Sequence, residues 1–108
     1  MKRLERMMCE VMRCHMETGA RPVVPLAGVA LWQIFAAISP GRFWGEAGPQ
    51  PLTVPEIREQ GAMMGLPLEL RHVDLIRALD RTWRELVTKG KGKAPLPELT
   101  PELFDAMF

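Results

Sequence analysis

The chain has 108 residues with a formal net charge of +1; 47% of its residues are hydrophobic and 25% are charged. This is the length of one globular domain and the balance of an ordinary soluble protein. The near-neutral charge argues against a nucleic-acid or anionic-membrane partner, because such binding needs a strong positive field. The charged N-terminus lacks the unbroken apolar run of a secretory signal, so we expect a cytoplasmic protein. The most apolar stretch, residues 23 to 38, is short for a membrane span and contains Pro25.

Two helices are predicted in the first part of the chain. The first covers residues 2 to 17, and helical spacing places five apolar residues on one face: Leu4, Met7, Met8, Val11 and Met12. Gly19 can end it, and the prolines of residues 21 to 26 favour an extended connector. The second helix is predicted from about residue 27 to 39. Apolar residues cover most of its circumference, which is typical of a helix at the centre of a core.

Residues 40 to 51 are predicted to form a loop, because they contain three prolines and three glycines. An aromatic pair, Phe43 and Trp44, lies inside this loop. A loop of this kind is normally pinned to the body by its aromatic side chains.

A capping box predicts the start of a third helix, with Thr53 as the cap and Glu56 three residues later. Gly65 and Pro67 are predicted to end this helix. Three apolar residues are predicted to face the core: Val54, Ile57 and Met64.

The longest amphipathic pattern predicts a fourth helix over residues 68 to 88. Its apolar stripe consists of Val73, Ile76, Leu79, Trp83 and Leu86. We interpret this stripe as the seam that meets Trp32 and Phe35 of the second helix.

Charged residues of the fourth helix are spaced for ion pairs. Arg81 and Glu85 are four residues apart, as are Asp80 and Arg84. Asp80 is interpreted as a partner of Arg84, or alternatively of Arg42, in which case it would fix the preceding loop to the bundle.

The C-terminal part is predicted to be tethered to the helical domain of residues 1 to 88. Residues 89 to 97 have the composition of a flexible basic linker. Residues 98 to 108 form a short amphipathic segment with four apolar positions on its face: Leu99, Leu103, Phe104 and Met107. An isolated helix of about eight residues is unstable in water, so this segment must dock on its own body or on a partner. Together these patterns predict an all-α fold, a small bundle of four helices with a short tethered C-terminal helix.

The sequence contains no pattern that predicts catalysis, a metal or a cofactor. Cys9 and Cys14 are five residues apart in a helix and point in different directions, so we expect reduced thiols. Together with His15 and His72 they lack the spacing of zinc ligands. No nucleophile elbow or phosphate-binding loop is present. We therefore expect a protein that is not an enzyme.

A helix-turn-helix DNA-binding regulator is the alternative function. Residues 52 to 79 have its outline, a helix, a turn with glycine and a second helix. Basic residues could line one face of the second helix: Arg71, His72, Arg77, Arg81 and Arg84. Acidic residues interrupt that face, namely Asp74, Asp80 and Glu85, so a solvated, salt-bridged surface is the preferred interpretation.

Residues 31 to 86 contain a Trp-x-x-Phe helix, an arginine in the next loop, and a final helix with an Ile-x-x-Leu-Asp-x-x-Trp pattern. The residues concerned are Trp32, Phe35, Arg42, Ile57, Ile76, Leu79, Asp80 and Trp83. This pattern resembles the small tail assembly chaperone-like proteins encoded among phage and prophage tail genes, although Trp83 stands where a tyrosine is more usual. The resemblance implies a non-enzymatic helical protein that holds tape-measure or tail-tube proteins before assembly.

Six apolar residues are the predicted partner-binding positions. Two are in the loop and four in the C-terminal segment: Phe43, Trp44, Leu99, Leu103, Phe104 and Met107. A further alternative is an adaptor subunit that forms a homo-oligomer through the C-terminal segment.

Overall fold

The computed structural model describes residues 2 to 89; Met1 and residues 90 to 108 lie outside the described part. The described residues form four helices: α1 (Lys2–Thr18), α2 (Val29–Ile38), α3 (Val54–Met63) and α4 (Leu70–Thr88). The shorter elements are the 3₁₀ turns η1 (Leu26–Gly28) and η2 (Ser39–Gly41) and the strands β1 (Trp44–Gly45) and β2 (Gly48–Pro49). The predicted small all-α bundle is confirmed. Lys89, the first residue of the predicted linker, is the C-cap of α4, while the rest of the linker and the C-terminal segment lie outside the described residues.

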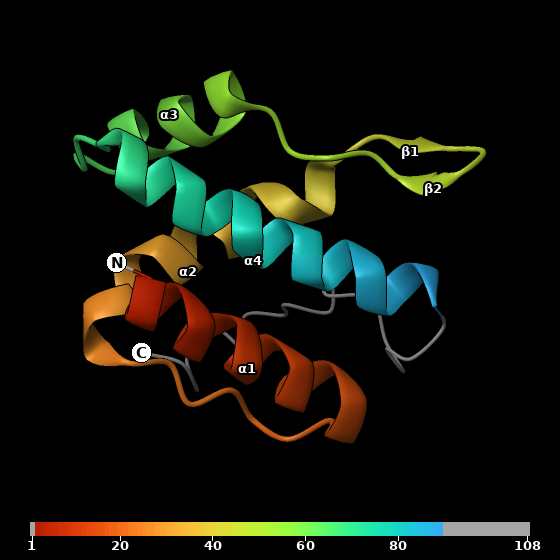
Figure 1. Cartoon of the computed structure of the whole chain (residues 1–108). Coiled ribbons are helices and arrows are strands. Elements are labelled where there is room, and N and C mark those ends of the chain that lie inside the picture. The colour runs from red at the N-terminus through yellow and green to blue at the C-terminus, as the bar shows by residue number, and fades with distance from the viewer. Residues whose placement is uncertain (1, 90–108) are drawn as a thin grey trace.

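Helix α4 runs through the middle of the molecule, with α1 along one side and α3 on the other (Figure 1). It contacts α1, α2 and α3. The predicted stripe is confirmed, since all five of its residues are buried: Val73, Ile76, Leu79, Trp83 and Leu86. A second face of α4 is also buried, formed by Leu75, Ala78 and Thr82. The second face is buried because α4 lies between other helices. A single apolar stripe in the sequence does not indicate such a position.

The face of α1 that packs into the core differs from the prediction. Its buried residues are Met8, Met12 and Met16, spaced four residues apart. Met7 was predicted for this face but is 45% exposed. A row of residues spaced by four runs nearly parallel to a helix axis, so the row that begins at Met8 turns Met7 outward. Gly28 permits close packing here, because a Cβ at that position would collide with the Met8 sulfur.

Both predicted boundaries of α3 are confirmed. Glu56 N–H donates to Thr53 Oγ1 at 3.3 Å, and Thr53 N–H donates to Glu56 Oε1 at 3.0 Å, which completes the capping box. At the other end Gly65 adopts a φ of 73°. Leu66 N–H donates to Gly61 O at 2.7 Å, as in a Schellman motif. Of the predicted core residues, Ile57 is buried and Val54 half-buried, but Met64 is 37% exposed because it is the C-cap.

The loop of residues 40 to 51 contains a small antiparallel hairpin that the sequence did not predict. Trp44 pairs with Pro49 and Gly45 with Gly48, and Gln50 N–H donates to Phe43 O at 2.8 Å. Strands of two residues are too short to show period-two alternation, so the composition indicated only a loop. No helix within residues 2 to 89 has the length and apolar character that a membrane span requires.

Candidate functional site

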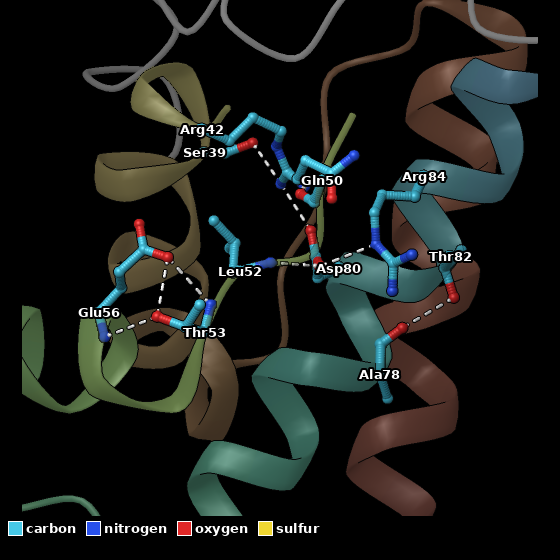
Figure 2. A network of polar contacts seen from close by, with 10 residues as sticks. All are labelled: Ser39, Arg42, Gln50, Leu52, Thr53, Glu56, Ala78, Asp80, Thr82 and Arg84. Carbon is cyan, nitrogen blue, oxygen red and sulfur yellow. Dashed lines mark hydrogen bonds and ion pairs between the residues drawn. The ribbon is translucent and has the colours of Figure 1, made fainter. Parts of the chain in front are cut away.

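Asp80, in the middle of α4, joins three parts of the chain, although its side chain is only 2% exposed. Its Oδ1 lies 2.6 Å from Arg42 Nη2, and its Oδ2 accepts from Arg84 Nε at 3.0 Å. The same Oδ2 accepts from the backbone N–H of Leu52 at 3.1 Å (Figure 2). Both partners predicted for Asp80 are therefore present together. One carboxylate fixes the two ends of the loop, at Arg42 and Leu52, to α4.

Arg42 holds the loop from the other side of this ion pair. Its Nη1 donates to Gln50 O at 3.0 Å, and its Nη2 donates to Ser39 Oγ at 3.0 Å. Its guanidinium carbon lies 4.1 Å from the ring centroid of Trp83, within the range of a cation–π contact. Burial lowers the pKa of Arg42 from its usual value, and the Asp80 carboxylate opposes that shift. A guanidinium stays protonated wherever proteins are folded, so two opposite charges are held together out of water.

Some buried side-chain polar atoms, in this cluster and elsewhere in the core, have no hydrogen-bond partner within residues 2 to 89. The unpaired atoms are Arg42 Nε, Asp80 Oδ1 and the indole nitrogens of Trp32 and Trp83. Asp80 Oδ1 is among them because its short contact with Arg42 lacks the alignment of a hydrogen bond. Each buried donor without a partner costs about 1–3 kcal/mol. The main effect of the cluster is therefore to fix the position of the loop on α4, and its net contribution to the free energy of folding is small.

The two aromatic residues that follow Arg42 are placed in different ways. Trp44 packs edge-on against Trp83, with ring centroids 6.1 Å apart and planes at 78°. It is nevertheless 48% exposed, and Phe43 is 83% exposed. Trp44 thus attaches the hairpin to the body, while Phe43 presents its ring to solvent. We use the term aromatic hairpin for residues 42 to 50.

The four other predicted partner-binding residues lie outside the described residues: Leu99, Leu103, Phe104 and Met107. The residues that carry the family resemblance are all inside the protein, none more than 6% exposed: Trp32, Phe35, Arg42, Ile57, Ile76, Leu79, Asp80 and Trp83. That pattern therefore describes how the helices pack. The surfaces that can meet a partner are formed by other residues.

A second surface feature was not predicted. A groove of about 430 Å³ lies between α1 and the connector that follows it. Met7 and Val11 line it from α1, and Val23 and Pro25 line it from the connector. The sequence analysis missed this groove because it placed Met7 on the face of the first helix that packs into the core.

The cysteines and histidines have local structural surroundings. Cys9 and Cys14 are free, and within residues 2 to 89 no three potential metal ligands come together. His15 Nδ1 lies 2.8 Å from Ala20 O, just beyond the end of α1. His72 Nδ1 accepts from Glu69 N–H at 3.0 Å and so caps the start of α4.

The predicted ion pair between Arg81 and Glu85 is not formed in the described part of the chain. Both side chains are exposed on α4. An exposed pair of this kind is worth only a few tenths of a kcal/mol, which is too little to hold two long side chains together.

No family model matches the chain, and no curated protein or solved structure matches it either.

Proposed function

We propose that this chain is a non-enzymatic protein that binds apolar segments of other proteins through the aromatic hairpin. Its clients would be tape-measure or tail-tube proteins, as the resemblance to tail assembly chaperone-like proteins implies. The observation that carries the proposal is the 83% exposure of Phe43 on a hairpin with a buried, charged anchor.

Rigid support makes an exposed aromatic side chain an effective binding residue. Phe43 lies between Arg42, whose side chain is 1% exposed, and Trp44, which contacts Trp83. The backbone that carries the ring is held by these contacts and has few conformations to lose on binding, so the entropic cost of association is reduced. Aromatic anchors of this kind commonly dominate the energy of protein interfaces.

The buried ion pair supports the same proposal. Apolar residues of similar volume often give equal or greater stability than a buried ion pair. Asp80, Arg42 and the Leu52 N–H instead impose one position on the loop. The arrangement suits a surface whose shape must be maintained before a partner arrives.

A recess of mixed character lies beside the hairpin. A hollow of about 340 Å³ lies beside β2, between the hairpin and the end of α4. Ala47 and Pro49 line it from the hairpin, and the side that faces α4 is polar, with Arg84, Glu85 and Thr88 among its residues. An apolar client would therefore meet charged groups at this recess and apolar surface at Phe43 and Trp44. Phe43, half-exposed Trp44 and this hollow provide an aromatic protrusion next to a recess.

The test is co-expression of the full chain with a tape-measure fragment that aggregates when expressed alone. We expect the wild-type chain to keep the fragment soluble, and Phe43→Ser to lose most of that effect while keeping its own unfolding midpoint. Leu70→Ser is the matched control, because Leu70 is 75% exposed on α4 and lies outside the hairpin. A fragment that stays insoluble with the wild-type chain would sink the proposal.

A further inference from the structure

The groove on α1 combines an apolar floor with positive charge. Of its apolar residues, Met7 is 45% exposed and Val23 is 81% exposed. Arg3 and Arg6 line its edge, and neither forms an ion pair with another described residue. Its acidic residue, Glu10, is already paired with Arg13 at 2.8 Å. The groove therefore favours an apolar ligand that carries negative charge.

The sequence of residues 98 to 108 has that chemistry. Thr100 and Pro101 can start a short helix, on which Leu103, Phe104 and Met107 share one face, and Leu99 directly precedes that start. Glu98 and Glu102 immediately precede Leu99 and Leu103, so each of these leucines has an acidic neighbour; we call this pair the acidic row. The segment contains three acidic residues and no basic one, so it complements the edge of the groove.

The connecting chain is long enough for the segment to reach α1. Arg6 lines the groove and also a second hollow that extends to Glu85, about one helical turn before Lys89. Nine residues lead from Lys89 to Glu98, and they can span about 30 Å. Because Arg6 lines both hollows, the groove lies beside the surface that leads to Glu85, and a span of this length can cover that path within one chain.

We propose that residues 98 to 108 dock in the α1 groove of the same chain, with the apolar face on Met7 and Val23 and the acidic row beside Arg3 and Arg6. The contact covers apolar surface that the described body leaves exposed. It is independent of the proposed client binding, because it uses neither Phe43 nor Trp44.

The test uses the full chain with labelled methyl groups of Met, Leu and Val. We expect nuclear Overhauser effects from the Leu103 and Met107 methyls to those of Met7 and Val23. In a mixture of two differently labelled populations, no such effect should connect one chain to another. Absence of all these contacts, or contacts only between chains, overturns docking within one chain.

A charge-reversal cycle tests the recognition itself. Arg3→Glu with Arg6→Glu, and separately Glu98→Arg with Glu102→Arg, should each lower the docking equilibrium constant about two- to thirtyfold, as expected for two exposed ion pairs. The docked fraction is read from the Val23 methyl shift, and combining all four changes should restore it. Arg58→Glu with Arg77→Glu is the control, because these exposed arginines lie on α3 and α4 outside the groove. Failure of restoration, or an equal effect of the control, contradicts the proposal.

Discussion

At the residue scale, Asp80 is the side chain on which the candidate site most depends. It accepts from the Leu52 N–H and Arg84 and neutralises Arg42. We expect Asp80→Ala to lower the free energy of unfolding by about 3–5 kcal/mol, because Arg42 is left buried without a counter-charge. Urea unfolding followed by tryptophan fluorescence measures this. Asp74→Ala, at an exposed position on the same helix, should change it by less than about 0.5 kcal/mol.

Substitution of Asp80, Arg42 or Arg84 should lower the free energy of unfolding by different amounts, in that order from largest to smallest. Arg42→Met leaves Asp80 with Arg84 and the Leu52 N–H, so we expect a smaller loss than for Asp80→Ala. Arg84→Met should cost at most about 1 kcal/mol, because the Arg84 side chain is 29% exposed and Asp80 keeps Arg42. The urea concentrations at the midpoints of unfolding, compared with one common slope of free energy against urea, give this order. Equal losses for all three would mean that Asp80 does not connect the others.

The contact of Asp80 with Arg42 could be predicted because of its position in the sequence. Asp80 directly follows Leu79 of the apolar stripe, so a helix packed along that stripe brings it to the core, where a charge needs a partner. The different roles of Phe43 and Trp44 could not be predicted. The two aromatics are adjacent and similar, and only the hairpin geometry places one against Trp83 and the other in solvent.

At the element scale, the end of α3 provides an unusual test, because Gly61 is helical and buried. Replacing a helical glycine with alanine normally stabilises by about 0.5–1 kcal/mol. Here a Cβ would lie 2.8 Å from the Leu68 side chain and 3.0 Å from Leu66 O. We expect Gly61→Ala to destabilise the protein by about 1–3 kcal/mol through overpacking, as measured by thermal unfolding.

A half-buried residue of the same helix, next to Gly61, is the control for that experiment. Gln60 comes directly before Gly61 in the chain and is only half-buried. Gln60→Ala should therefore leave the midpoint of thermal unfolding almost unchanged. A rise in the midpoint of Gly61→Ala would show that the turn after α3 moves away to admit the methyl group.

The start of α3 offers a smaller, independent effect. Thr53→Ala removes the hydroxyl that accepts from the Glu56 N–H, and we expect a loss of about 1 kcal/mol. Denaturant unfolding resolves a change of this size. The control is Thr88→Ala, an exposed threonine at the end of α4, which should have little effect. An unchanged midpoint for Thr53→Ala would show that Asp80, through Leu52, fixes this end of the helix without the cap.

The limits of helices were predictable where a local signal exists. Thr53 with Glu56, and Gly65, act through atoms within a few residues, so the sequence contains the whole interaction. The core face of α1 was only partly predictable. Met7 and Met8 are equally apolar, and the choice between them depends on where α4 and η1 lie.

At the scale of the whole molecule, the interior and the surface differ in how far sequence predicts them. The apolar pattern of α2 and α4 predicted the bundle, because burial follows from hydrophobicity and period. The α1 groove was not predicted. It depends on the connector passing alongside α1, with Val23 and Pro25 opposite Met7, which no local pattern specifies.

The arrangement of α4 bears directly on the alternative of a helix-turn-helix regulator. In that fold the first turns of the second helix must reach base edges. Here Arg71 pairs with Glu69 at 2.9 Å, and His72 caps the helix through its Nδ1. The exposed stripe farther along α4 is balanced in charge, with two acidic and two basic residues: Asp74, Arg77, Arg81 and Glu85.

We therefore expect the full chain to pass through a duplex-DNA column at about 50 mM salt without retention, since binding of this kind requires several uncompensated phosphate contacts. Arg77→Ala with Arg81→Ala should elute at the same position as the wild-type chain. Retention that falls steeply with added salt and is lost in this double variant would instead establish α4 as a DNA-binding helix. Phe43→Ser separates the two functions, because it should remove most of the client solubilisation without any effect on this column.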